Sequence, residues 1–513
     1  MLGRITTLCF QGLEATPIDV QVQLANGLPA FSIVGLPDKA LAESKERVRG
    51  ALFALGIAMP AKRITVNLAP ADLQKEGSHY DLPIALALLG TLGALPKDAL
   101  WSFVALGELG LDGSLISTGG ILSASLFASQ QQKGLICPFE GGPEAAWAGD
   151  LQIIASKTLL GVINHLKGTQ VLAPPTPLTE QKETHQKDLQ EVKGQHLAKR
   201  ALEVTAAGGH NLLMVGPPGA GKSMLAERLP TILPPLSPVE ALEATMIHSM
   251  GGRLKEGRLL KKRPFRNPHH SASMAALIGG GLKGKPGEIS LAHRGVLFLD
   301  ELPEFNRALL EALRQPLESG EAVIARANAH ITYPARVQLI AAMNPCACGY
   351  LGHAQKQCRK APLCAERYQN RLSGPLLDRL DLFITMQALS PFALEQTDQG
   401  TTSQLVVQRV AAAWAIQKER HSQTNHHNQS SFLNGQIPFK DLERHLHLDK
   451  AASKILQTTT LQWGLSARSY HKVLRLARTI ADLANSTRIT KLHASEALSY
   501  RMWPFKEKAA YTA

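Results

Sequence analysis

The chain has 513 residues, of which 44% are hydrophobic and 19% are charged. This composition is typical of globular proteins and excludes a chain that is disordered throughout, and the length favours about three domains. Lysine and arginine together number 55 against 42 aspartate and glutamate residues, so the formal net charge is +13. A positive charge of this size favours a polyanionic partner such as nucleic acid. The six cysteines are too few for a disulfide-stapled scaffold of this length.

The sequence shows no predicted targeting or membrane segment. Residues 1–15 lack the unbroken apolar core of a signal peptide. The longest uncharged apolar stretch, residues 82–95, contains Pro83, Gly90 and Gly93 and is too short to span a bilayer. We therefore expect a soluble cytoplasmic protein without a membrane partner.

The first third of the chain predicts an α/β domain over residues 1–171. Alternating apolar and polar residues predict strands, and apolar residues at helical spacing predict helices. On these patterns we expect strands at residues 18–24 and 63–68, a helix at 38–55 and a buried helix at 82–95. Residues 172–190 are rich in proline and polar residues and lack an apolar period, which is typical of a linker.

Residues 191–390 alternate between predicted helices and strands, the pattern of a parallel sheet covered by helices. We expect helices at residues 195–207 and 222–229 and strands at 212–215, 296–299 and 337–342. Residues 391–513 are helical in pattern, and the polar stretch 421–431 indicates a loop. The predicted fold class is therefore α/β with a helical C-terminal part.

Residues 216–223 fit the phosphate-binding pattern G-x-x-x-x-G-K-[ST], between a predicted strand and a predicted helix. In this setting backbone N–H groups and the helix N-terminus bind phosphate oxygens. We expect Lys222 to reach the β- and γ-phosphates of ATP and Ser223 to bind Mg²⁺. The predicted nucleotide-binding residues are Gly216, Pro217, Pro218, Gly219, Ala220, Gly221, Lys222 and Ser223.

Polar residues follow two further predicted strands. Asp300 and Glu301 come after the apolar strand 296–299, and ligands bind at the carboxyl ends of strands in open α/β sheets. We expect Asp300 to bind Mg²⁺ and Glu301 to orient the attacking water. Asn344 follows the next predicted strand and is placed to sense the γ-phosphate or to position water. The alternatives are an acidic strand cap and a turn-forming asparagine before a proline.

Four of the six cysteines cluster in the sequence, namely Cys346, Cys348, Cys358 and Cys364. Four thiolates are the ligand set of a closed tetrahedral zinc site, so we predict a structural zinc knuckle over residues 346–364. His353 is a candidate replacement for one cysteine. Four reduced thiols in a loop are the alternative interpretation.

Basic residues concentrate between Arg253 and Arg266 and recur in the glycine-rich segment 279–287. Basic loops of this kind grip DNA phosphates without reading the base sequence. A predicted hairpin at 322–332 places another arginine near its tip. A solvated or subunit-interface charged face is the alternative. The candidate DNA contacts are Lys261, Lys262, Arg263, Arg266, Lys283, Lys285 and Arg326.

The order of the P-loop, the acidic strand end and the strand-end asparagine resembles that of the AAA+ ATPases. Four strings resemble the Mg-chelatase-like branch of that group and, within it, the ComM/YifB family, over nearly the whole chain. The strings are RPFRNPHH at 263–270, PGEISLAH at 286–293, SGPLLDRLD at 373–381 and GLSARSY at 464–470. The resemblance implies a P-loop AAA+ core and a C-terminal helical lid.

The same resemblance implies a ring hexamer with ATP at the subunit interfaces. Arg379 matches the arginine finger that a subunit supplies to its neighbour. Arg468 matches the sensor-2 arginine that contacts the γ-phosphate, and Arg475 is the second choice for that role. The alternatives are a surface arginine that pairs with a nearby aspartate and an ordinary solvated helix arginine.

The N-terminal domain resembles the Lon-protease-like, S5-like α/β domain of this family. The alignment places His79 where the catalytic serine of Lon proteases lies, and Ser78 falls one position early. Residues 113–127, where the catalytic lysine is needed, contain no lysine. A serine without a base is not activated, so we expect this domain to be non-proteolytic.

The family resemblance implies an ATP-driven DNA translocase or helicase that promotes branch migration while incoming DNA is integrated in natural transformation. It implies ATP and Mg²⁺ as cofactors, single-stranded and branched DNA as partners, a homo-hexamer, and recombination proteins as further partners. The alternatives are a Mg-chelatase-type motor that remodels a protein complex, an ATP-dependent Lon-like protease, and a module that only binds.

Overall fold

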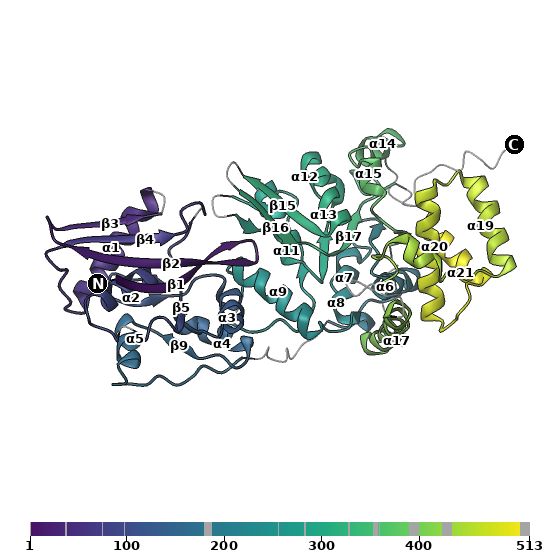
Figure 1. Cartoon of the computed structure of the whole chain (residues 1–513). Helices are drawn as coiled ribbons and strands as arrows, with labels where there is room; N and C mark the ends of the chain where they lie inside the picture. Colours follow the sequence, from purple (N-terminus) through teal and green to yellow (C-terminus); the bar gives the residue numbers. More distant parts are fainter. Residues whose placement is uncertain are drawn as a thin grey trace.

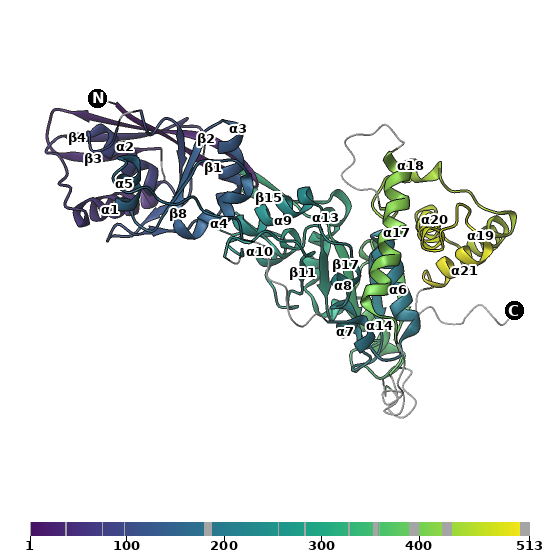
Figure 2. The same ribbon diagram turned by 90° about the horizontal axis from the view of Figure 1, so that it is seen from below.

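The computed structural model describes residues 2–35, 38–73, 75–96, 98–178, 187–254, 256–281, 284–326, 329–351, 358, 360–388, 400–422 and 433–502. An N-terminal α/β part, a central α/β part and a C-terminal helical part follow one another along an elongated molecule (Figure 1, Figure 2). Over these residues, the helices are too short or too polar to cross a membrane.

A seven-stranded sheet forms the N-terminal part. In spatial order its strands are β3 (Ala30–Val34), β4 (Arg63–Ala69), β2 (Glu14–Ala25), β1 (Leu2–Gln11), β5 (Phe103–Ala105), β8 (Gly134–Pro138) and β9 (Ile153–Ser156). β2 pairs antiparallel with both β1 and β4, and the other neighbours pair in parallel. A short ribbon of β6 (Glu108–Leu109) and β7 (Leu115–Ile116) lies outside this sheet.

The helices of this part are α1 (Asp38–Ala54), α2 (Asp81–Thr91), α3 (Ile121–Gln130), α4 (Gly142–Ala145) and α5 (Leu159–Leu166). Every residue of α2 is buried, as the all-round apolar sequence predicts. The helix ends at Thr91 and not at Leu95, because Gly93 takes a left-handed φ of +75° and the chain turns there.

A parallel five-stranded sheet forms the central part. Its strands, in spatial order, are β11 (Phe265–Arg266), β14 (Val296–Leu299), β17 (Gln338–Met343), β10 (Leu212–Val215) and β18 (Leu382–Thr385). Leu212 and Met214 of β10 belong to one apolar cluster, and Leu213 and Val215 belong to another. The sheet is therefore buried on both faces, which explains why its strands are almost wholly apolar.

Helices cover both faces of this sheet (Figure 1). They are α6 (His196–Gly208), α7 (Lys222–Ala226), α8 (Leu229–Ile232), α9 (Pro238–Met250), α10 (Met274–Leu277), α11 (Glu288–Leu291), α12 (Arg307–Ala312), α13 (Arg314–Ser319), α14 (Leu363–Gln369) and α15 (Gly374–Leu377). The helix predicted at 222–229 is divided in two, since Pro230 occupies the first turn of α8.

Two hairpins project from the central part. β15 (Glu321–Arg326) pairs antiparallel with β16 (Ala329–Pro334), which confirms the predicted hairpin, and Arg326 lies in its last pair, opposite Ala329. β12 (Gly279–Gly280) pairs with β13 (Lys285–Pro286) in the glycine-rich segment. Leu13 of the N-terminal part packs against Ile324, Ile331 and Tyr333 of the larger hairpin.

The C-terminal part is helical. It contains α17 (Ser403–Ser422), α18 (Phe439–Glu443), α19 (Lys450–Trp463), α20 (Ala467–Leu483) and α21 (Lys491–Ser499). Apolar residues of α20, such as Leu476 and Ile480, join the same cluster as Leu202 of α6. The helical part is thus anchored to the central sheet through α6, and the predicted α/β fold with a C-terminal helical region is confirmed.

Candidate nucleotide site

The P-loop lies between β10 and α7, as predicted. Gly219 and Gly221 have left-handed φ values of +79° and +89°, which favour glycine. A Cβ added to either residue would meet no atom within 4 Å. The backbone therefore curves around open space at the N-terminus of α7, and the loop fits the phosphates of a nucleotide.

Lys222 points back into this loop. Its Nζ donates to Gly216 O at 2.7 Å, to Pro217 O at 3.0 Å and to Asn344 Oδ1 at 3.1 Å. Burial lowers the pKa of Lys222, and the carboxylates of Asp300 and Glu301 oppose that effect. The amine is therefore held among neutral oxygens that a phosphate can replace.

The acidic residues after β14 lie against the P-loop helix. Ser223 Oγ donates to Asp300 Oδ2 at 2.6 Å, so the two predicted Mg²⁺ ligands face each other. Glu301 N–H donates to Asp300 Oδ1 at 2.9 Å, and Glu301 has a φ of +51°, rare for a non-glycine residue. A hydroxyl and a carboxylate oxygen form an oxygen-rich site of the kind that Mg²⁺ prefers.

Asn344 joins the two halves of this site. β17 lies between β10 and β14, with Met343 opposite Val215 and Ala341 opposite Leu299. The residue after β17 therefore lies at the sheet edge between the P-loop and the acidic strand end, and the bond from Lys222 to Asn344 shows its contact with the P-loop. The structure brings together Lys222, Ser223, Asp300 and Asn344, which are far apart in the sequence.

One residue close to Glu301 was not singled out from the sequence. His270 Nδ1 lies 3.8 Å from Glu301 Oε2, and its ring packs at a tilt of 35° against His269 and contacts Phe305 edge-on. The only sequence signal for this position is the string 263–270, where both histidines follow β11. His270 is placed to hold the Glu301 side chain.

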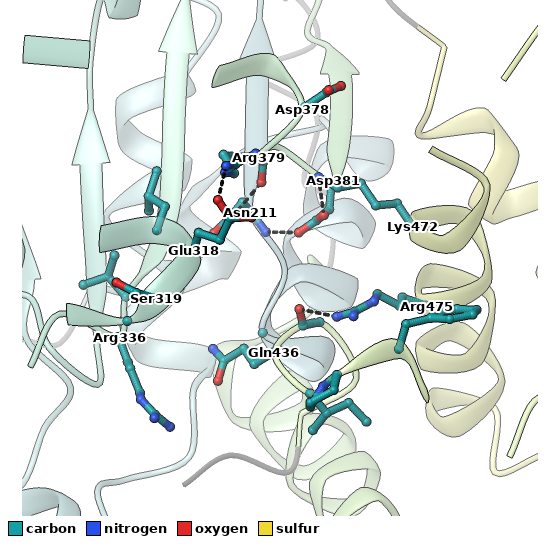
Figure 3. Close-up of a pocket in the computed structure, with 18 of the residues that line it drawn as sticks. Asn211, Glu318, Ser319, Arg336, Asp378, Arg379, Asp381, Gln436, Lys472 and Arg475 are labelled. Atoms are coloured by element: carbon teal, nitrogen blue, oxygen red, sulfur yellow. Dashed lines mark hydrogen bonds and ion pairs between the residues drawn. The ribbon is translucent and has the colours of Figure 1, made fainter. Parts of the chain in front are cut away.

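The two predicted arginines lie in a different place. Arg379 and Arg468 line a pocket of about 670 Å³ between the central sheet and α20 (Figure 3). Arg379 donates to Glu318, and Arg468 Nη2 lies 3.6 Å from the same carboxylate. Among the described contacts neither arginine touches its own P-loop. Both arginines therefore share one acidic partner in a pocket that none of the described P-loop residues lines.

Neighbouring residues of α20 hold this pocket together. Lys472 Nζ lies 2.9 Å from Asp381 Oδ1, and the Lys472 ammonium lowers the pKa of the buried Asp381 against the effect of burial. Arg475, the second choice for sensor 2, donates to Gly435 O at 2.8 Å and to Asn434 O at 3.2 Å (Figure 3). Arg475 is thus engaged with a backbone turn, whereas Arg468 remains half-exposed.

The four clustered cysteines converge. The Sγ atoms of Cys346, Cys348, Cys358 and Cys364 all lie within 4.8 Å of one another. All six cysteines of the chain are free thiols. His353 lies outside the described residues.

The predicted DNA contacts differ in how exposed their side chains are and in the partners that they contact. Lys261, Lys262 and Lys285 are exposed on the central part. Arg266 forms a two-bond pair with Glu288, at 2.5 and 2.7 Å. Lys283 lies outside the described residues, and Arg326 is placed only by its backbone.

Arg263 is not suited to the DNA contact predicted for it. Its side chain is 6% exposed and donates to Pro234 O, Arg294 O and Glu240. Its guanidinium also lies over the Trp414 ring at 4.9 Å from the centroid. Arg263 therefore links the central part to α17, and its buried guanidinium is not exposed for a DNA contact.

The N-terminal part shows no assembled serine–lysine pair among its described residues. Ser78 donates to Glu108, and His79 is buried with Nε2 2.9 Å from Leu8 O. Burial lowers the pKa of His79 to about 4. Lys75, also buried, donates to the Pro70 and Leu73 carbonyl oxygens and not to Ser78.

The chain matches three family models along most of its length. The model described as magnesium chelatase, subunit ChlI, matches residues 188–394, the model described as subunit ChlI of Mg-chelatase matches residues 20–141, and the ChlI C-terminal model matches residues 400–501. The magnesium-chelatase 38 kDa subunit of Rhodobacter capsulatus is 28% identical over 171 residues, 30% of this chain and 49% of that subunit.

Two relatives match almost end to end. The competence protein ComM of Haemophilus influenzae is 45% identical over 496 residues, which are 96% of this chain and 95% of ComM. The protein YifB of Escherichia coli is 43% identical over 501 residues, 98% of this chain and 97% of YifB. The chain therefore belongs to the ComM/YifB family of Mg-chelatase-like AAA+ ATPases.

Proposed function

We propose that this protein is an ATP-driven, homo-hexameric DNA translocase that promotes branch migration while DNA is integrated in natural transformation. The observation that carries the proposal is the contact of Lys222 with Asn344 and of Ser223 with Asp300 beside a P-loop, on a chain 45% identical to a competence protein over 96% of its length. Cytoplasmic single-stranded and branched DNA would be its substrate, and recombination proteins would be its partners.

The chemistry of the site would be ATP hydrolysis. Phosphate oxygens would replace the carbonyl oxygens that now accept from Lys222, and Mg²⁺ would be held by Ser223 and Asp300. Mg²⁺ would neutralise charge on the phosphates. Glu301 would orient water, and Asn344 would link the γ-phosphate to β17.

The arginine pocket supports a site that is completed by a neighbouring subunit. Arg379 and Arg468 share Glu318 and line one pocket, so one adjacent chain could present its ATP to both. An arginine supplied in this way stabilises transition-state charge and is worth about 10³- to 10⁵-fold in rate. ATP hydrolysis would then require two adjacent subunits of the ring. This requirement would couple ATP turnover to movement of one subunit relative to the next.

DNA as the substrate is supported by charge. Lys261, Lys262 and Lys285 are exposed in the basic segment of the central part, and the whole chain carries a formal charge of +13. Contacts of this type bind phosphates whatever the base sequence. The protease alternative is disfavoured because Lys75 and Ser78 are committed to other partners.

The decisive experiment measures ATPase rate with no DNA and with single-stranded, duplex and four-way-junction DNA, at several salt concentrations. We expect DNA to stimulate ATP turnover and this stimulation to fall as the salt concentration rises. We also expect the branch point of a labelled junction to migrate, so that its strands separate into products, only when ATP is hydrolysed. Lys222→Ala is the matched control, since it retains the basic residues but should lose turnover. A rate indifferent to every DNA, together with no salt-dependent DNA binding, would refute the translocase and favour a motor that remodels proteins.

A further inference from the structure

The cysteine cluster is organised by the backbone that carries it. Cys346 is fully buried two residues after Asn344. Gly349 N–H donates to Cys346 O at 2.9 Å, and Gly349 has a left-handed φ of +79°, so a tight turn presents the first two thiols. Cys364 is the second residue of α14, and its N–H donates to Lys360 O at 2.9 Å. Two separate turns thus bring two thiol pairs together.

The spacing of the sulfur atoms suits one metal ion. Zn–S bonds of about 2.3 Å in a tetrahedron place sulfur atoms about 3.8 Å apart. The four Sγ atoms are mutually within 4.8 Å, and Cys346 and Cys348 approach to 3.2 Å. Four sulfur ligands select zinc over hard cations and leave no position open for catalysis.

The cluster also contacts the nucleotide site. A Cβ added to Gly349 would lie 2.7 Å from Pro218 Cδ, so the turn rests against the P-loop. Gln369 Nε2 of α14 donates to Pro345 O at 3.1 Å, next to Asn344. A metal that joins the two turns would therefore fix the chain that directly follows Asn344.

We propose that Cys346, Cys348, Cys358 and Cys364 bind one structural Zn²⁺ as thiolates, and that this ion holds Asn344 and the Gly349 turn against the P-loop. Each thiol gives up its proton when the metal binds, and no electron is transferred. The link to ATP rests on the proposed function, whereas zinc binding itself does not.

The first test is the metal content of the full-length protein, purified under reducing conditions without added zinc. We expect about one zinc per chain in the wild type and in Cys137→Ala, whose buried thiol lies in β8 outside the cluster. We expect Cys358→Ser and Cys364→Ser to lose most of the zinc. Iron in place of zinc, disulfides between these cysteines, or failure of the metal-free protein to take up added Zn²⁺ would overturn the proposal.

The second test removes zinc from the wild type, so that it does not depend on a variant that folds. A zinc-selective chelator should lower the thermal unfolding temperature and weaken binding of a fluorescent ATP analogue measured in excess Mg²⁺. Added Zn²⁺ should restore both, and added Mg²⁺ should not. Zinc removal that changes neither property would refute the positioning role. An absence of DNA stimulation with one zinc bound would refute only the translocase.

Discussion

Ser249 Oγ, near the end of α9 in the central part, donates a 2.5 Å hydrogen bond to Glu144 Oε1 of the N-terminal part. Gly120 N–H donates to the same Ser249 oxygen at 2.9 Å, and Leu122 N–H donates to Glu144 at 2.8 Å. Glu144 is buried, and burial raises its pKa although both hydrogen bonds lower it. The two α/β parts are therefore joined by a buried polar contact as well as by the apolar packing of Leu13.

This contact predicts a pH-dependent stability. Because the pKa of Glu144 is higher in the folded protein than its ordinary 4.5, burial of the charged form costs stability at pH values above the folded pKa. That cost is relieved as the pH falls through the folded pKa toward 4.5, by about 1.4 kcal/mol for each pH unit between the two values.

Glu144→Gln isolates this effect. The variant keeps an oxygen to accept from Leu122 and Ser249 but cannot ionise. We expect the unfolding temperature of the wild type, relative to that of Glu144→Gln, to be higher at pH 4.5 than at pH 7. Ser249→Ala should cost about 1 kcal/mol at both pH values. A difference that stays flat or changes in the opposite direction would show that Glu144 does not titrate as a buried carboxyl.

Glu301→Gln should separate ATP binding from ATP hydrolysis. The amide keeps the shape of the side chain but cannot act as a base, so we expect turnover to fall by about 10²- to 10⁴-fold with little change in the Kd for ATP. Glu304→Gln is the matched control, since Glu304 pairs with Arg371 at 2.8 Å and should be nearly silent. Rapid turnover by Glu301→Gln would transfer its role to another residue.

Arg379 should act on the ATP of a neighbouring chain. Lys222→Ala and Arg379→Ala should each be inactive alone, because one loses the phosphate contact and the other loses the arginine that a neighbour needs. When the two variants are mixed and allowed to exchange subunits, some interfaces combine an intact Lys222 with an intact Arg379. We expect ATPase activity to reappear in the mixture. Mixtures that stay inactive, with subunit exchange shown by labelled chains, would place Arg379 in its own site or in a structural role.

The sequence is most informative where a functional residue comes directly after a strand in the chain. Asp300 and Asn344 each come after apolar strands of one parallel sheet, and such strands share an edge, so their meeting could be predicted without a structure. The contact of Glu318 with both arginines could not be predicted from the sequence. The same is true of the hydrogen bond from Ser249 to Glu144. Each lies on an ordinary helix, and its partner is set by tertiary packing. Arg263 shows the same limit, because a basic run looks alike whether an arginine faces solvent or is buried.

The last prediction compares Arg263 with Lys285. Both were predicted from the sequence to contact DNA, but Arg263 is buried and Lys285 is exposed. Arg263→Ala leaves Glu240, itself 21% exposed, without its buried partner and removes the guanidinium from Trp414. Because Glu240 keeps Arg294 at 3.9 Å, we expect the variant to destabilise the fold by about 1–3 kcal/mol. Lys285 is exposed, so Lys285→Ala should change stability by less than about 0.5 kcal/mol.

The salt dependence of DNA binding should rank the two variants in the opposite order. Among folded molecules, Lys285→Ala should change it more than Arg263→Ala. Lys285→Ala should reduce the slope of log K against log salt by about 0.7–0.9, the effect of one lost phosphate contact. Lys454→Ala is the matched control, because it removes the same charge from exposed α19, away from the basic segment. An unchanged slope in Lys285→Ala, or an equal change in Lys454→Ala, would mean that DNA responds to overall charge and not to this loop.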